Sequence, residues 1–249
     1  PTPAFETTKA MSLRELMGFS PLGCVGMFLL GGVFSAQFGM ASVYGSEAGL
    51  SVGEISTFVA TIFIGGMITQ YPIGWLSDRM DRRTLIVLTA AVGAVGASIG
   101  VMSNGDFTLI LVAAFLMGST SNPLYSLLLA YTNDFLEHED MAAGSGGMIF
   151  LNGLGAVSGP LITGRMLGVF GPSGFYMLIG ALFSMLAIYA VYRATQRPAL
   201  PPDETGSLVA MSQSVMTPVA MEIAQEHAIE TDLEVEHETP ADQADALYA

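Results

Sequence analysis

Six long apolar stretches, separated by short polar or glycine-containing gaps, dominate the chain. A helix rises about 1.5 Å per residue, so roughly 20 apolar residues cross the hydrocarbon core of a bilayer. The stretches do not alternate apolar and polar residues as the strands of a membrane barrel do. The pattern therefore predicts an all-α membrane protein with six transmembrane helices, at residues 20–44, 55–76, 84–103, 107–131, 145–170 and 174–192.

The segments on either side of this 20–192 region have different patterns. Ser12 and Glu15 have the spacing of a capping box beside apolar residues, which predicts a short amphipathic helix in a cytoplasmic linker at residues 1–19. Residues 198–249 hold 11 of the 22 acidic residues and none of the 8 Lys and Arg. Residues 193–249 are therefore expected to form an acidic, mostly disordered cytoplasmic tail.

The composition narrows the class of protein further. Of the 249 residues, 51% are hydrophobic and only 12% are charged, which is about half the charged share of a soluble domain. The formal net charge is −14. These values exclude an ordinary soluble enzyme and a basic protein that binds nucleic acid. Cys24 is the only cysteine, which excludes a disulfide scaffold.

The basic residues indicate a direction in the membrane. With the N-terminus inside, only Arg165 lies near the outer end of a span. By the positive-inside rule, both termini are then cytoplasmic, and the protein is expected to be a multi-pass protein of the plasma (bacterial inner) membrane. The basic residues on the inner side are Lys9, Arg14, Arg79, Arg82, Arg83, Arg193 and Arg197.

The amide side chains are distributed unevenly among the spans. Gln37, Gln70, Asn122 and Asn152 lie in the first, second, fourth and fifth spans, and the third and sixth have no Asn, Gln, His or charged residue. Because polar groups are costly in lipid, we expect the third and sixth spans to face lipid and to be outermost. This is a repeat of three helices, and an inverted three-plus-three repeat is common in secondary transporters. For Asn122 and Asn152, a hydrogen bond to a neighbouring helix is the structural alternative to a role in binding.

The fifth span is rich in small residues. Gly155 and Gly159 are four residues apart, a spacing that lets helix backbones approach closely. Pro160 is expected to kink this helix, as Pro123 is expected to kink the fourth. The glycine pattern lies in the middle of an apolar run with no soluble strand before it, so it does not indicate a nucleotide site.

Groups for covalent or metal chemistry are not expected at membrane depth. His138, His227 and His237 all lie outside the spans, and no span carries a deep Asp or Glu. A membrane enzyme would need paired acids, a metal cluster or a nucleophile with a base. We therefore expect no catalytic residue, no metal and no cofactor.

The segment between the second and third spans has a recognisable motif. Gly74, Asp78, Arg79, Arg82 and Arg83 resemble the loop signature G-x-x-x-D-R-x-G-R-R of the major facilitator superfamily, with Asp81 in place of a glycine. Asp81 is well placed to cap the next helix. The glycine-proline pair of the fifth span is similar to a motif of many antiporters in the family. The run at residues 123–134 is similar to an uncharacterised bacterial, sugar-permease-like branch.

The resemblance covers residues 12–195 and implies a fold, an activity and a set of residues. A family member has twelve helices in two halves, so this chain is expected to be the C-terminal half, with the N-terminal six-helix half missing. The signature aspartate, Asp78, would close the cytoplasmic gate against that other half. The helices corresponding to the first and fourth spans line the substrate cavity in the family, which makes Gln37, Asn122 and Tyr125 candidates for binding a small solute, with Asn152 behind them.

Two functions remain open at this stage. The first is secondary active or facilitative transport of a small solute by alternating access. The second is a self-contained six-helix protein that acts as a homodimer or as an accessory subunit of a membrane complex. The chain begins at Pro1 and not at methionine, which favours a fragment. The sequence upstream of Pro1 would decide between the two.

Overall fold

The computed structural model describes residues 11–196, except the side chains of residues 138 and 139. Within that range the regular structure is entirely helical, and six helices are long and apolar enough to cross a membrane, so the predicted all-α fold with six transmembrane helices is confirmed. The tail from residue 197 and the linker before residue 11 lie outside the described residues. The elements are α1 (Leu13–Phe19), α2 (Pro21–Phe34), the π-helical turn η1 (Ser35–Gly39), α3 (Ala41–Glu47), α4 (Val52–Ser77), α5 (Arg82–Met102), α6 (Phe107–Asn133), α7 (His138–Phe170) and α8 (Ser173–Ala194).

Polar caps set several helix ends. The predicted capping box of α1 forms, with the Ser12 hydroxyl accepting from the Glu15 amide. Asp81 caps α5 as expected, accepting from the amide of Arg83. A second capping box, formed by Ser51 and Glu54, starts α4 at Val52, three residues before the start predicted from the apolar pattern alone.

The first predicted span, 20–44, differs from the structure. α2 passes into the π-helical turn η1, and Met40, with φ −116°, separates η1 from α3. The Met40 amide still donates to the Ala36 carbonyl at 3.1 Å, so α3 continues in about the same direction as η1. The apolar pattern could not show this break, because Phe38 and Met40 are as apolar as the rest of the span. The first membrane-crossing helix therefore comprises Pro21–Gly39.

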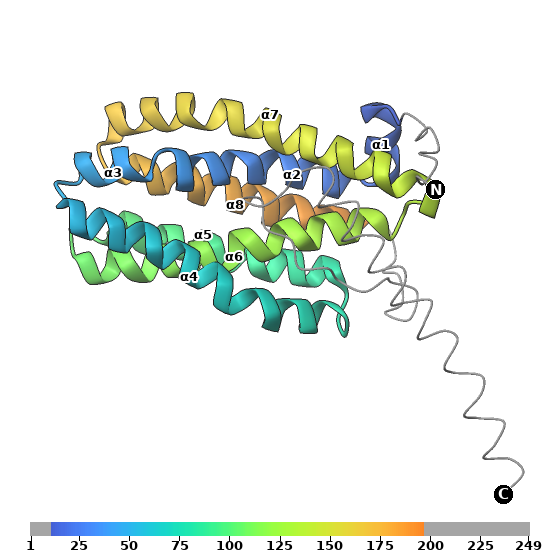
Figure 1. Ribbon diagram of the computed structural model, residues 1–249, viewed down its shortest axis with the longest axis horizontal. Helices are drawn as coiled ribbons and strands as arrows, with labels where there is room; N and C mark the ends of the chain where they lie inside the picture. The colour runs from blue at the N-terminus through green and yellow to red at the C-terminus, as the bar shows by residue number, and fades with distance from the viewer. Residues whose placement is uncertain (1–10, 197–249) are drawn as a thin grey trace, which may run out of the picture.

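The six long helices form a bundle in which the two triplets exchange their first helices (Figure 1). α2 packs against α7 and α8, and α6 packs against α4 and α5 in the equivalent way. α5 and α8, the third helices of the two triplets, pack against each other. This pairing is what a two-fold relation between the triplets requires, and it leaves α2 and α6 at the centre, where they are the most buried of the six.

The exposed surface of this chain lies mostly on α4 and α7, which are more exposed than α5 and α8. The expectation that the third and sixth spans face lipid stays a prediction, because exposure within one bundle does not separate a face toward lipid from a face toward further helices. Most of the large exposed side chains of α4 and α7 are apolar, such as Met67 and Leu161, each 73% exposed, and Arg165 of α7 is an exposed exception. The count of amides in a helix shows its polarity, but it does not show which face is left without a neighbour.

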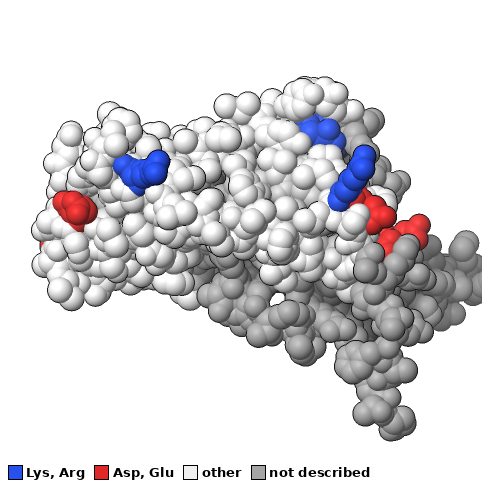
Figure 2. All heavy atoms as spheres, turned by 90° about the horizontal axis from the view of Figure 1, so that it is seen from above, with Lys and Arg blue, Asp and Glu red and all other residues white. Residues whose placement is uncertain are grey.

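Charged side chains lie toward the two ends of the bundle. On the face in Figure 2, blue and red residues occur near each end, and uncharged residues cover the middle. An uncharged belt between charged ends is the arrangement that a bilayer requires, since charge at membrane depth is costly.

Candidate functional site

A cavity of about 380 Å³ lies where α4, α6 and α7 meet the end of α2. Its lining comes from the four spans that carry amides and from neither of the two that lack them. Three of its walls are phenylalanine rings, and Asn122 is its one amide. The lining residues are Phe34, Ser35, Phe38, Gly39, Phe63, Asn122 and Ala156.

Aromatic contacts hold the apolar walls of this central cavity in place. Phe38 stacks on Phe34 with ring centroids 5.8 Å apart and lies 4.8 Å from the ring of Phe63. Tyr125, on α6, meets Phe34 edge-on at 6.1 Å. Such ring pairs favour one geometry beyond simple area burial, so α2, α4 and α6 are joined around the cavity by rings.

Gln37 is the most unusual side chain near the cavity. It lies in η1 between two lining residues, Ser35 and Phe38, and it is fully buried. Neither its amide nitrogen nor its oxygen has a hydrogen-bond partner among the described residues. An unsatisfied buried polar group costs about 1–3 kcal/mol, and π-helical turns occur frequently at functional sites. The position therefore has the features expected of an amide that pairs with a ligand or a partner.

Asn122 and Tyr125 lie one turn apart on α6 but have different surroundings. Asn122 lines the cavity, and its amide rests on Gly66 of α4, where a Cβ would come within 2.2 Å of the amide nitrogen. Tyr125 is buried and does not line the cavity, although its ring contacts Phe34, which does. Of the predicted binding residues, the structure thus brings Gln37, Asn122 and Tyr125 to one region.

Asn152 and Gln70 lie away from the cavity lining. The Asn152 amide donates to the backbone carbonyl of Met27 on α2 at 3.2 Å, and the Gln70 amide donates to the Ser126 hydroxyl on α6 at 3.0 Å. Both amides therefore join helices, which for Asn152 is the structural alternative stated above.

The glycines of α7 lie at its crossing with α2. A Cβ on Gly155 would come within 1.9 Å of the Phe28 carbonyl oxygen, and one on Gly159 within 1.7 Å of the Ser35 hydroxyl. Pro160 is inside α7, directly after this contact. At Gly155 any larger side chain would force the helices apart, because the neighbour is a backbone atom, whereas at Gly159 the Ser35 hydroxyl would first have to rotate away.

In the signature motif between α4 and α5, Asp78 and Arg79 are exposed, and Arg82 and Arg83 are buried. Asp78 ends α4 and is exposed, and its amide donates to the Gly74 carbonyl. The guanidinium of Arg79 folds back over the ring of Trp75 at 4.1 Å. Arg82 and Arg83 are both only 3% exposed, so they belong to the interior at this end.

Arg82 is held by several partners from two helices. It forms an ion pair with Asp134, the residue that ends α6, and both side chains are at most 4% exposed. It also donates to the Ser77 hydroxyl at 3.2 Å. Arg83 pairs with Asp81 at 3.6 Å. The sequence motif locates the arginines but does not identify Asp134 as the partner, because that pairing depends on how α5 and α6 pack.

The sequence comparisons agree on one group of proteins. Residues 23–228 match the Major Facilitator Superfamily. An uncharacterised MFS-type transporter, YcaD of Escherichia coli O7:K1 (strain IAI39), is 23% identical over 195 residues, which are 78% of this chain and 49% of that protein. YcaD of E. coli strain K12 (DH10B) is 23% identical over 191 residues, 77% of this chain and 48% of that protein. The chain thus spans about half the length of these relatives.

Proposed function

The chain belongs to the major facilitator superfamily, and on this basis we propose that it is one six-helix half of a transporter that moves a small solute across the membrane by alternating access. The proposal places the solute in the central cavity, with Gln37 and Asn122 as its hydrogen-bonding partners and Tyr125 holding the aromatic wall. The single observation that supports this site best is the fully buried, unpaired amide of Gln37 next to the cavity.

The other half of the transporter would cover the apolar faces of α4 and α7. These two helices flank the central cavity through Phe63 and Ala156, and they are the most exposed of the six. The family resemblance supports an N-terminal six-helix half as the occupant, and the positive-inside pattern supports cytoplasmic termini. A reading frame that adds six more spans ahead of Pro1 would support this arrangement, and one that begins at Pro1 would favour a homodimer or an accessory subunit.

Alanine at either cavity amide is expected to impair uptake. In the full-length protein, Gln37→Ala and Asn122→Ala should each lower uptake of a transported solute about tenfold, because each removes a hydrogen bond that a buried solute cannot replace with water. Uptake into proteoliposomes across a solute panel measures this. The matched control is Ser98→Ala, which removes an exposed hydroxyl on α5 that, among the described residues, bonds to the Ala94 carbonyl.

Unchanged uptake in both amide variants would contradict the proposed binding site. A loss of uptake in the Ser98 control of equal size would show that the assay reports general damage to the helices and not the loss of a contact with the solute.

Asp78 is proposed as the gate residue at the end of the bundle that carries α1. In the family resemblance this carboxylate meets a helix N-terminus of the other half, and a carboxylate is stabilised by the positive end of a helix dipole. Asp78→Asn should therefore lower uptake by about tenfold, a loss of interaction of roughly 1–2 kcal/mol, with normal membrane insertion. The control is Glu47→Gln, at an exposed acid near the opposite end. Wild-type uptake in the Asp78 variant would contradict the gating role.

A further inference from the structure

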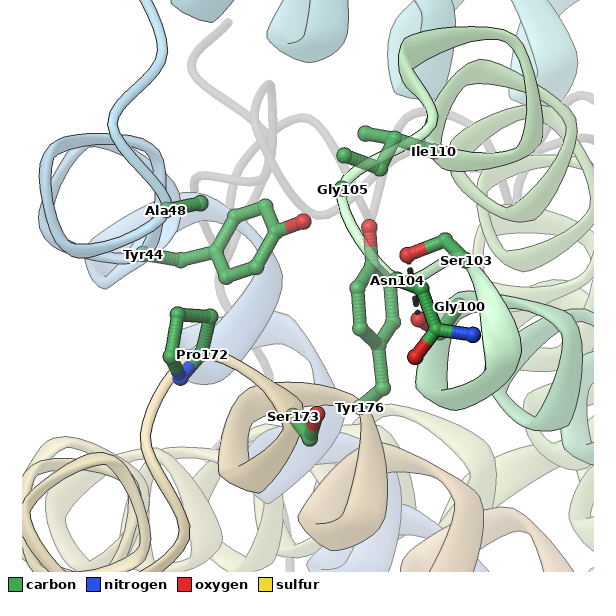
Figure 3. A pocket seen from close by; sticks show the side chains of 10 residues that line it. All are labelled: Tyr44, Ala48, Gly100, Ser103, Asn104, Gly105, Ile110, Pro172, Ser173 and Tyr176. Atoms are coloured by element: carbon green, nitrogen blue, oxygen red, sulfur yellow. Dashed lines mark hydrogen bonds between the residues drawn. The ribbon is translucent and has the colours of Figure 1, made fainter.

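A second cavity lies at the opposite end of the bundle from α1, and it is separate from the proposed solute site. Its volume is about 200 Å³, and it is enclosed by α3, the α5–α6 turn and the start of α8 (Figure 3). It shares no lining residue with the central cavity. The residues that line it are Tyr44, Ala48, Gly100, Ser103, Asn104, Gly105, Ile110, Pro172, Ser173 and Tyr176.

Tyr176 is the buried polar group of this end cavity. Its side chain is 1% exposed, and its hydroxyl makes no hydrogen bond of standard geometry within the described part of the chain, although the Tyr44 hydroxyl is close enough to interact with it. Figure 3 shows the hydroxyls of Tyr176 and Tyr44 pointing toward the same space, on the side of Ile110. A buried tyrosine hydroxyl normally finds a partner, so this one has the geometry of a group that pairs with something inside the cavity.

The two tyrosines are held firmly in these positions. The Tyr44 ring stacks on Phe175 at 4.6 Å and meets Tyr176 edge-on at 5.1 Å. The Tyr176 ring also lies directly on the backbone of Gly100, where a Cβ would come within 2.3 Å of a ring carbon. The rim is a tight turn with positive φ at Asn104 (47°) and Gly105 (85°). Packing thus presents the hydroxyls to the cavity before any ligand arrives.

The chemistry of the lining limits what can bind. No charged side chain lines the end cavity, so an ion would lose its hydration without gaining a counter-charge. The tyrosine hydroxyls can donate or accept. The Ser103 hydroxyl donates to the Gly100 carbonyl at 2.8 Å and can still accept, and the Asn104 amide, which donates to the Met102 carbonyl at 3.2 Å, adds an acceptor oxygen. The side chains of Ala48, Ile110 and Pro172 are apolar. A neutral molecule with hydroxyl groups on a short carbon chain fits this lining, because it carries no charge, can hydrogen-bond to the polar groups and can contact the apolar ones.

The volume of the end cavity also favours a small ligand over a single water molecule. A single water, with a share of liquid volume of about 30 Å³, would be enough to pair with the Tyr176 hydroxyl, and the cavity has room for several times that volume. It is nevertheless smaller than the cavities of about 300 Å³ or more that take drug-sized ligands. From this combination we propose that the end cavity is a binding site for a small neutral polyol, distinct from the central solute site.

The test uses the full-length protein in lipid nanodiscs and saturation-transfer NMR with meso-erythritol and xylitol as probes. Both polyols should give signals that saturate, and D-erythronate, a carboxylate of similar size, should not. Tyr176→Phe removes only the hydroxyl and should weaken erythritol binding about 3- to 10-fold. Ala48→Phe fills the cavity while leaving the hydroxyl in place and should abolish binding.

Two controls locate the polyol signal. Tyr192→Phe removes the hydroxyl of an exposed tyrosine on the same helix, and Asn122→Ala alters only the central cavity; both should bind erythritol as the wild type does. Absence of polyol signals in the wild type, signals that persist in both Tyr176→Phe and Ala48→Phe, or equal binding of erythronate would each overturn the proposal and leave the cavity as a solvent-filled space.

Discussion

Replacing Arg82 by glutamine is expected to destabilise the folded protein by about 3–5 kcal/mol. Arg82 and Asp134 form an ion pair in which neither side chain is more than 4% exposed. Removing the arginine leaves the Asp134 carboxylate buried without its counter-charge and leaves the Ser77 hydroxyl without its donor. The measurement is the free energy of unfolding of the full-length protein in detergent, titrated with a denaturant.

The neighbouring arginine provides the control for this experiment. Arg79 is exposed, and within the described residues its guanidinium contacts the ring and the carbonyl of Trp75. Arg79→Gln should therefore lower the free energy of unfolding by less than about 1 kcal/mol. The double variant Arg82→Leu/Asp134→Leu should recover most of the loss, because replacing both partners of a buried pair with apolar residues is often neutral. If the double variant is as unstable as Arg82→Gln, the ion pair does not account for the effect.

A single methyl group at Gly155 is expected to destabilise the bundle by about 1–3 kcal/mol. The Cβ of Gly155→Ala would lie within 1.9 Å of the Phe28 carbonyl oxygen, and a backbone atom cannot move aside as a side chain can. α2 and α7 would have to separate, which would also disturb the bond between Asn152 and Met27. The same unfolding titration measures the loss.

Gly153 offers a closely matched control on the same helix. No atom lies within 4 Å of the position that a Cβ on Gly153 would occupy, so Gly153→Ala should be neutral or should stabilise the protein by up to about 1 kcal/mol through helix propensity. Equal losses in Gly153→Ala and Gly155→Ala would show that close packing of α2 on α7 is not the cause.

The candidate site was only partly accessible to sequence reasoning. The amides mark the four spans that line the central cavity, and the family resemblance selected Gln37 and Asn122 among them as candidates. The amides also led to Asn152, whose amide bonds to Met27 instead. The sequence does not distinguish an amide that lines a cavity from one that bonds to a neighbouring helix, because the rotation of the helix determines where the side chain points. The cavity phenylalanines were missed because a phenylalanine in an apolar span gives no local signal of its own.

The sequence by itself determined the number of membrane helices, the approximate ends of most of them and the cap at Asp81. These features are local: a bilayer demands about 20 apolar residues per span, and a cap acts within one turn. The tertiary structure alone decided that α4 and α7 carry the exposed apolar face, that Arg82 pairs with Asp134, and that Tyr176 points its buried hydroxyl into a cavity. These features depend on which helix faces meet, and residues far apart in the chain determine that together.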